Sequence, residues 1–237
     1  MTQNFDIKIY ADGASIEGMK NALNKWPISG FTTNPSLMKK AGVKDYLQFA
    51  KDALDAVGEL PISFEVFSDD FKDMEKEAEK ISAFGKNVFV KIPITNTRGK
   101  SSVPLIERLS KKGIQINITA IFTLDQVENV LKVLQPNTHN IISVFAGRIA
   151  DTGIDPLPIM EKAVTLVKQY PQADLLWASC RELLNIFQAQ SVGVDIITVT
   201  SSVLSKLSFI GKKPENFSLQ TVQEFSRDGK ALGFTII

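Results

Sequence analysis

Short apolar runs rich in β-branched residues alternate along the chain with longer segments in which apolar positions recur at helical spacing. Runs of the first kind are typical of buried strands, and segments of the second kind are typical of amphipathic helices. The pattern predicts eight strands, at residues 5–11, 30–34, 62–66, 88–92, 115–121, 141–146, 175–179 and 196–200. Between them it predicts helices at residues 15–26, 43–58, 69–85, 103–113, 124–135, 156–170 and 180–193.

Strands that alternate with helices form βα units around a parallel sheet, which places the chain in the α/β class. Eight such units in 237 residues fit the lower size range of a (β/α)8 TIM barrel better than an open doubly wound sheet. Because no Pro-rich or Ser-rich linker interrupts the pattern, we predict a single barrel domain over residues 1–237. Residues 215–237 have a helix pattern with an apolar end, and we expect a C-terminal helical tail that packs either on a neighbouring subunit or on the same barrel.

Charge and composition exclude several classes of function. The formal net charge is +1, so there is no bulk electrostatic argument for binding nucleic acid or an anionic membrane. The first residues run into a strand pattern without a signal sequence, and no apolar run has the length of a membrane span, so we expect a soluble cytoplasmic protein. With one cysteine, Cys180, and one histidine, His139, we expect no internal disulfide, no cysteine- or histidine-based metal site and no Ser-His-Asp triad.

Polar residues gather near the carboxyl ends of the predicted strands, where the active site of a (β/α)8 barrel lies. Most of them are residue types that a buried strand would otherwise exclude. One polar residue in a buried strand is usually a satisfied structural group, but seven strands with this feature at the same end indicate a functional pocket. The residues are Asp12, Asn34, Glu65, Lys91, Asn117 in phase with Thr119, Ser143 in phase with Phe145, and Ser179.

Lys91 lies in the middle of an apolar stretch, NVFVKIPIT, which reads as a buried strand. Desolvation or a neighbouring cation favours a neutral, nucleophilic amine, so a lysine inside a barrel suits Schiff-base catalysis. The alternative is an ion pair with Glu65 or Asp12, which would keep the amine charged, and spacing alone leaves both open. A Schiff-base cycle also needs an acid and a base; the two carboxylates could divide these tasks, and Thr119 could hold a water that relays a proton.

Six motifs resemble the motif series of the transaldolases, including the small subgroup that contains the fructose-6-phosphate aldolases. They are ADG at 11–13, TTNPS at 32–36, VKIP at 90–93, NITAIF at 117–122, FAGRIAD at 145–151 and ASCR at 178–181. The resemblance covers almost the whole chain in order and approximate spacing. It implies an enzyme of the pentose phosphate pathway that uses no metal or cofactor and whose partners are sugar phosphates. Because small members of the family form rings, it also implies a homo-oligomer.

The same resemblance implies a role for each matching residue. Lys91 would form a Schiff base with fructose 6-phosphate or sedoheptulose 7-phosphate, and Asp12 would take the proton of the C4 hydroxyl. Glu65 would act with a water positioned by Thr119 in imine formation and hydrolysis. Asn34, Asn117 and Ser143 would hold the hydroxyls of the dihydroxyacetone unit. The phosphate would be bound by Arg148, Ser179 and Arg181, beside a helix that we expect to start at SCREL.

Two positions bear on whether the dihydroxyacetone unit is transferred to an aldose phosphate or released. The small aldolases resemble one another in having glutamine and tyrosine where this chain has Glu65 and Phe145, so we favour a transaldolase. A phenol at position 145 could hydrogen-bond the active-site water and assist hydrolysis, which Phe145 cannot do. Fructose-6-phosphate aldolase and a catalytically silent phosphate-binding barrel are the alternatives. The segment TNTRGKSS, 95–102, differs from the family pattern and could alter acceptor preference.

Overall fold

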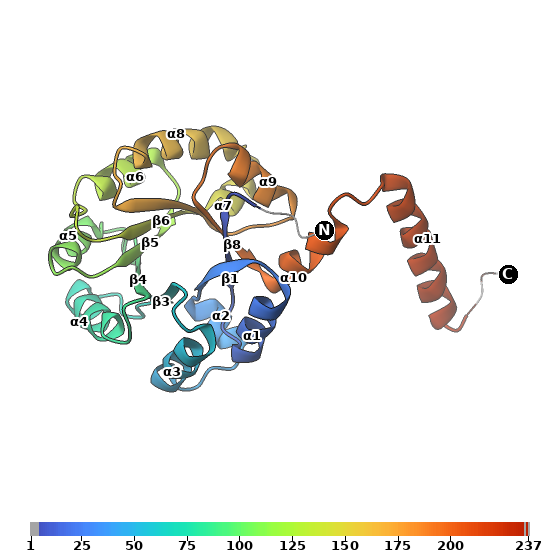
Figure 1. Cartoon of the computed structure of the whole chain (residues 1–237), viewed down its shortest axis with the longest axis horizontal. Helices are drawn as coiled ribbons and strands as arrows, with labels where there is room; N and C mark the ends of the chain where they lie inside the picture. Colours follow the sequence, from blue (N-terminus) through green and yellow to red (C-terminus); the bar gives the residue numbers. More distant parts are fainter. Residues whose placement is uncertain (1–4, 235, 237) are drawn as a thin grey trace. The chain divides into compact units, whose positions relative to one another are not determined.

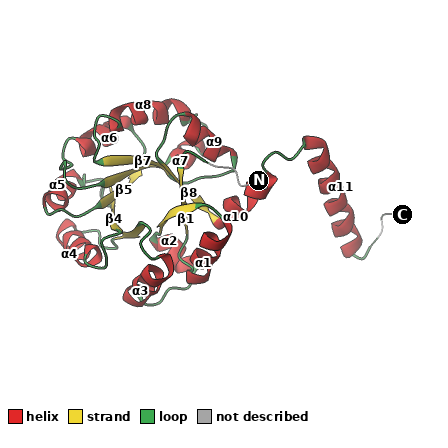
Figure 2. Cartoon of the chain, viewed as in Figure 1, coloured by secondary structure: helices red, strands yellow, loops and turns green. Residues whose placement is uncertain are grey.

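A computed structural model describes residues 5–234 and 236 of the chain. The chain divides into two compact units, Met1–Leu204 and Ser205–Ile237. In the first unit, eight parallel strands pair in sequence order and the eighth pairs with the first, so the sheet closes into a barrel. Helices surround this ring of strands (Figures 1 and 2). The architecture confirms the predicted (β/α)8 barrel with an additional C-terminal helix.

The strands are β1 (Lys8–Asp12), β2 (Ile28–Thr32), β3 (Ile62–Glu65), β4 (Val88–Pro93), β5 (Ile116–Ile121), β6 (Asn140–Val144), β7 (Ala173–Trp177) and β8 (Ile196–Thr200). The helices of the first unit are α1 (Ile16–Lys25), α2 (Pro35–Lys40), α3 (Tyr46–Val57), α4 (Phe71–Ser82), α5 (Val103–Lys111), α6 (Leu124–Leu131), α7 (Ala146–Ala150), α8 (Leu157–Val167), α9 (Leu184–Ser191) and α10 (Ser201–Leu204). The second unit contains η1 (Ser205–Phe209), a 3-10 helix, and α11 (Pro214–Ala231).

Side-chain caps explain where several of the helices begin. Ser15, Asn34, Asp45, Asp70 and Thr123 each accept a hydrogen bond from a backbone N–H in the first turn of the following helix. Such caps satisfy donors that have no partner within the helix. The cap at Asn34, followed by proline at the first helical position, also ends β2 two residues earlier than predicted and starts a short helix that the pattern did not predict.

Apolar side chains fill the barrel interior below its carboxyl-terminal end. This cluster comprises Tyr10, Phe89, Ile141, Leu176, Ala178 and Ile196. Gly30 makes room for one of the rings, because a Cβ atom at this position would lie 2.5 Å from the Tyr10 ring. Two residues further along, the same strands carry Asp12, Thr32, Lys91, Ser143 and Thr198. Because strand side chains alternate between two faces, these polar groups also point into the barrel, above the apolar cluster.

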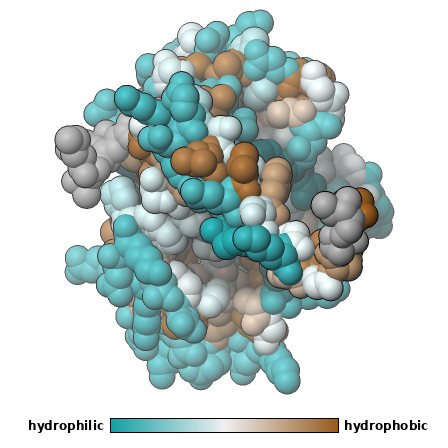
Figure 3. Space-filling view, turned by 90° about the vertical axis from the view of Figure 1, so that its right-hand side faces the viewer, coloured by the Kyte–Doolittle hydropathy of each residue, from teal (hydrophilic) through white to brown (hydrophobic). Residues whose placement is uncertain are grey.

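The second unit consists mainly of α11, none of whose described residues is buried. Its exposed apolar side chains include Phe217, Leu219, Val222 and Phe225. Figure 3 shows apolar surface among hydrophilic atoms on one side of the molecule. No helix in the described part of the chain is long and apolar enough to cross a membrane.

Candidate active site

A cavity of about 110 Å³ opens at the carboxyl ends of the barrel strands. Its lining is formed by Asp12, Thr32, Asn34, Lys91, Thr119, Ser143, Phe145, Arg148, Leu176, Ala178, Ser179 and Thr198. Glu65, Asn117 and Arg181, also predicted for the site, do not line the cavity and lie around it.

Lys91 is only 6% exposed, and its ammonium group has two partners. Nζ donates a hydrogen bond to the backbone oxygen of Thr33 at 2.9 Å and lies 3.1 Å from Oε2 of Glu65. The predicted alternative of an ion pair with Glu65 is therefore present in the structure. It is compatible with catalysis, because the paired carboxylate can accept the proton that the amine must lose before it attacks a carbonyl group.

Asp12 faces the same cavity from β1. Burial raises the pKa of its carboxyl group, while the charge of Lys91 and a hydrogen bond from Thr32 act in the opposite direction. Thr32 donates to Oδ1 of Asp12 at 2.8 Å, and the Thr32 hydroxyl is in turn hydrogen-bonded to Thr198. A carboxyl group with a raised pKa takes up a proton more readily than an exposed one, which favours proton transfer to and from a substrate.

Thr119 presents a buried hydroxyl group to the cavity. Its Oγ1 has no hydrogen-bond partner in the described part of the chain, which costs free energy unless a ligand or water satisfies the group. The following residue, Ala120, has a φ angle of 59°, and the pairing of β5 with β6 shifts register between Ile118 and Ile121. A non-glycine residue in this region is uncommon, and strain of this kind often marks a functional site.

Below the cavity, Asn117 holds Ser143 in place. The Asn117 side chain donates from Nδ2 to Oγ of Ser63 at 3.0 Å and accepts from Oγ of Ser143 at 2.6 Å. Asn117 is fully buried, so it orients Ser143 rather than reaching into the cavity. Asn34 uses Oδ1 to accept from the backbone N–H of Leu37 as the cap of α2. Asn34 lines the cavity, and its Nδ2 group forms no hydrogen bond to the described residues.

Arg148 and Ser179 line the opposite part of the cavity. The Arg148 guanidinium lies 5.7 Å from the centre of the Phe145 ring. Ser179 follows β7, which ends at Trp177 and not at residue 179 as predicted. The residues of this segment that join the interior cluster are Leu176 and Ala178, so Ser179 is out of phase with them. It reaches the cavity because its φ angle of 65° turns the chain.

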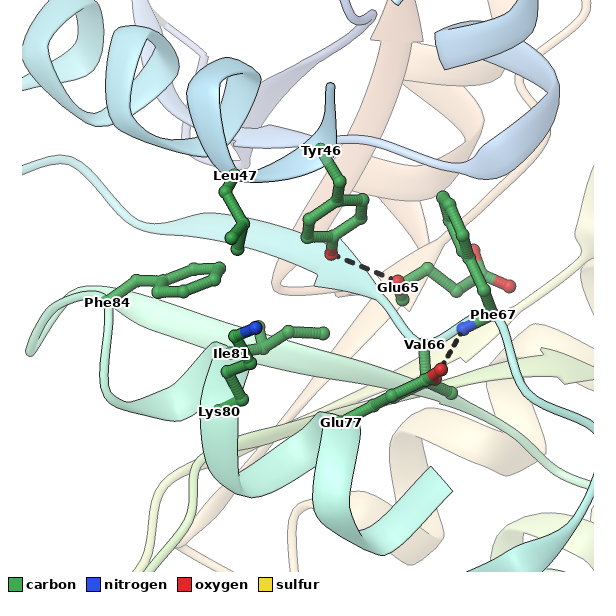
Figure 4. A pocket seen from close by; sticks show the side chains of 9 residues that line it. All are labelled: Tyr46, Leu47, Glu65, Val66, Phe67, Glu77, Lys80, Ile81 and Phe84. Carbon is green, nitrogen blue, oxygen red and sulfur yellow. Dashed lines mark hydrogen bonds between the residues drawn. The ribbon is translucent and has the colours of Figure 1, made fainter. Parts of the chain in front are cut away.

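A second cavity, of about 250 Å³, lies beside β3, and Glu65 is one of the residues that line it (Figure 4). The Tyr46 hydroxyl donates to the backbone oxygen of Glu65 at 3.1 Å. The Glu77 carboxylate accepts from the backbone N–H groups of Phe67 at 2.8 Å and Ser68 at 3.0 Å, and from the Ser68 hydroxyl at 2.6 Å. These contacts fix the chain where it leaves β3, directly after the carboxylate that pairs with Lys91.

Comparison with known proteins identifies the family. The model of the transaldolase/fructose-6-phosphate aldolase family matches residues 9–236. A "Probable transaldolase" of Thermoanaerobacter sp. (strain X514) is 35% identical over 85% of this chain and 89% of its own length. Another of Thermoplasma volcanium is 33% identical over 94% of this chain and 99% of its own length. The chain belongs to the transaldolase/fructose-6-phosphate aldolase family. The resemblance seen in the motifs is thereby confirmed, and family membership indicates an aldolase or transferase.

The helix expected at SCREL in this transaldolase-family chain begins later than predicted. α9 starts at Leu184, and its N-cap residue, Leu183, makes no side-chain hydrogen bond. The backbone N–H groups of Arg181 and Glu182 instead donate to Oδ1 of Asn185. These amides are therefore not free to bind a phosphate group, and the expectation of a helix start there was wrong. The Arg181 side chain is paired with Asp151.

Some groups of the transaldolase-family site were missed at the sequence level. Thr32 bonds to both Asp12 and Thr198, and Ser63 bonds to Asn117. The hydroxyl-rich run TVTSS, 198–202, was visible in the sequence, and a period-two reading of β8 would have placed Thr198 inside the barrel. The backbone oxygen of Thr33 carries no signal in the sequence, because any residue supplies the same acceptor.

Proposed function

We propose that the protein is a transaldolase that transfers a dihydroxyacetone unit from a ketose phosphate to an aldose phosphate through a Schiff base on Lys91. One observation carries the proposal: a buried lysine with its ammonium 3.1 Å from the Glu65 carboxylate lines a cavity that also contains Asp12. A buried amine next to a base and a second carboxyl group has the parts that imine chemistry needs. We take fructose 6-phosphate and sedoheptulose 7-phosphate as the donors.

In the proposed reaction, Glu65 accepts a proton from Lys91 and the neutral amine attacks the C2 carbonyl carbon of the ketose phosphate. The carbinolamine then loses water, with protons passed by Glu65 and a water held at the Thr119 hydroxyl. Asp12 takes the proton of the C4 hydroxyl, the C3–C4 bond breaks, and its electron pair enters the iminium as an enamine. The aldose phosphate leaves, and the enamine attacks the aldehyde of the acceptor in the reverse sequence.

The groups around the cavity support the same assignment for substrate binding. The free Nδ2 of Asn34 and the Ser143 hydroxyl held by Asn117 can bond the hydroxyls of the dihydroxyacetone unit. Arg148 and Ser179 can bind the phosphate group, and Arg181 can join them when its side chain leaves Asp151. Guanidinium groups are well suited to phosphate because they offer paired N–H donors.

Transfer is favoured over release by the side chains at two positions. Phe145 lines the cavity and has no hydroxyl group with which to activate a water against the covalent intermediate. Glu65 is ionisable, whereas a glutamine at this position could not accept the proton of Lys91. The intermediate is therefore expected to wait for an aldose phosphate acceptor, as a role in the pentose phosphate pathway requires.

The first test traps the Schiff base with borohydride in the presence of fructose 6-phosphate and locates the adduct by peptide mapping. Free dihydroxyacetone is assayed in parallel with and without erythrose 4-phosphate. We expect an adduct on Lys91, none in Lys91→Arg, and turnover that requires the acceptor. Release of dihydroxyacetone without acceptor would identify a fructose-6-phosphate aldolase. Absence of an adduct on Lys91 would favour a catalytically silent phosphate-binding barrel.

We further propose that the protein acts in the cytoplasm as a homo-oligomer, in which the tail of one copy packs on its neighbour. The exposed apolar side chains of α11 support this assembly, because an isolated soluble helix rarely leaves so many apolar groups in water. In a closed ring, the apolar side chains of α11 would be covered in every copy. No nucleic acid or membrane partner is proposed.

A further inference from the structure

The Arg181 side chain is held by a carboxylate outside the cavity. Its Nε donates to Oδ1 of Asp151 at 3.1 Å, and Nη2 contacts Oδ2 of the same carboxylate. The two parallel contacts form a bidentate guanidinium–carboxylate pair. Arg148 and Ser179 line the cavity, whereas Arg181 does not. The ion pair therefore uses the donors that a substrate phosphate would need.

The fold brings this carboxylate to the phosphate-binding side of the cavity. Asp151 directly follows α7, the short helix that also carries Arg148. The start of α7 packs tightly against the segment that carries Arg181, because a Cβ atom on Gly147 would lie 1.7 Å from the Ser179 backbone oxygen and 3.3 Å from Cγ of Arg181. The stem of Arg181 thus passes along α7, between the arginine that lines the cavity and the carboxylate beyond it.

We propose that Asp151 is an internal competitor for the substrate phosphate, which must displace it from Arg181 before both arginines can bind. The proposal rests on the function proposed above. A carboxylate and a phosphate present the same pair of oxygen atoms to a guanidinium group, so one can replace the other. The side chains of Arg181 and Asp151 are 46% and 51% exposed, and ion pairs this open to water are weak enough to exchange.

Such competition sets the affinity of the site for anions. A dianionic phosphate binds the guanidinium more strongly than a single carboxylate does, because its oxygen atoms carry more charge. A sugar without phosphate leaves the pair closed and gains nothing from Arg181. Asp151 therefore lowers the affinity for every anion that uses Arg181, but it leaves the binding of unphosphorylated ketoses unchanged.

The test is the dissociation constant of inorganic phosphate, measured by calorimetry for Asp151→Asn, Asp151→Ala and Glu182→Gln. Glu182 adjoins Arg181 in sequence, and in the described part of the chain its side chain forms no hydrogen bond or ion pair with the guanidinium, so its substitution removes the same charge and keeps the pair. We expect phosphate to bind about two- to fivefold more tightly to both Asp151 variants than to Glu182→Gln, as the loss of an exposed ion pair allows. The KM for fructose 6-phosphate should fall in parallel, and that for fructose should not change.

Phosphate binding that weakens in the Asp151 variants would overturn the proposal, because Asp151 would then position Arg181 for the phosphate group. Equal affinities in all variants, or no binding to any of them, would also overturn it. Thermal unfolding of each variant identifies any loss of folding. Because phosphate binding needs no turnover, failure of the Lys91 chemistry in the trapping experiment is distinguishable from failure of this competition.

Discussion

Burial raises the pKa of Asp12 even though Lys91 and the Thr32 hydroxyl act against it. Desolvation is therefore the dominant influence on this carboxyl group, and the fold holds its proton more tightly than the unfolded chain does. The contribution of Asp12 to stability is full below its unfolded pKa, near 3.8, and is lost as the pH rises through the higher folded pKa. The ionised Asp12 carboxylate thus destabilises the fold at neutral pH.

Asp12→Asn should make the protein more stable than wild type at pH 7.5, because it removes a buried charge and keeps the side-chain shape. The advantage should shrink as the pH falls toward 3, where the wild-type carboxyl group is protonated in both states. Thermal unfolding between pH 3 and 8 checks this, with the exposed Asp55→Asn as the matched control. A variant that is less stable than wild type at pH 7.5 would show that pairing with Lys91 outweighs burial.

Thr32→Val should impair the acid–base function of Asp12. The substitution keeps the volume of the side chain but removes the donor that stabilises the Asp12 carboxylate at 2.8 Å. Hydrogen bonds to charged groups contribute about 1.5–3 kcal/mol, so kcat/KM should fall by about tenfold or more and the acidic limb of its pH profile should move to higher pH.

Thr198→Val is the graded comparison, since Thr198 reaches Asp12 only through Thr32. Its effect should have the same sign and be smaller. An unshifted pH profile in both variants would show that the two threonines do not influence the proposed acid–base function of Asp12.

Helix α4 holds the segment that follows Glu65 in place through hydrogen bonds. Glu77, on this helix, accepts one hydrogen bond from the backbone N–H of Phe67 (Figure 4) and two from Ser68. A second contact ties the same segment to the loop after β4, where Asp69 accepts from the N–H and the hydroxyl of Thr97 at 2.7 Å each. An outer helix therefore controls the position of the carboxylate that pairs with Lys91.

Glu77→Gln should lower kcat by about tenfold with little change in KM, because the amide group turns a donor toward donors and loses at least one of the three bonds. The exposed Glu79→Gln, on the same helix and paired with Lys112, is the control. Measuring kcat and KM together with the unfolding midpoint separates positioning from stability. A variant with a lower midpoint but normal kcat would indicate a purely structural role.

At the scale of helices and strands, the sequence predicts the structure wherever the spacing of apolar residues determines it. The eight strands, and the inward direction of Asp12, Lys91 and Thr119, follow from apolar runs and alternation alone. Periodicity failed at Ser179, whose place depends on a left-handed backbone conformation, and at the short helices α2 and α7, which have too few residues for a pattern. Pairing of Arg181 with Asp151 joins side chains from two βα units and has no local signature.

At the scale of the whole molecule, the chain consists of a barrel with its own core and a tail without one. The barrel strands and their helices bury an apolar core within the first unit, whereas α11 buries none of its described residues and exposes Val222 and Phe225. The tail therefore has the exposed apolar groups expected of an interface, and the cavity that contains Lys91 lies within the first unit. Substitutions in α11 that disrupt the proposed oligomer should therefore leave the cavity of the barrel intact.

Val222→Glu combined with Phe225→Glu should dissociate the proposed oligomer, because the interface would have to bury two charges. The circular dichroism spectrum and the unfolding of the barrel should be retained. Sedimentation velocity at working concentration checks the subunit number, with Ser226→Glu as a control that adds charge at an exposed polar position of α11. A wild-type chain that sediments as a monomer would refute the assembly.

The contact of Tyr10 with Gly30 has a consequence for how this barrel can change during evolution. The Tyr10 ring occupies the volume into which a side chain at position 30 would extend. Neither residue is readily exchanged alone, since a methyl group on the glycine would collide with the ring and a smaller residue at position 10 would leave a void. The two positions should therefore covary among relatives, with side chains appearing at position 30 only where the residue at position 10 has become smaller.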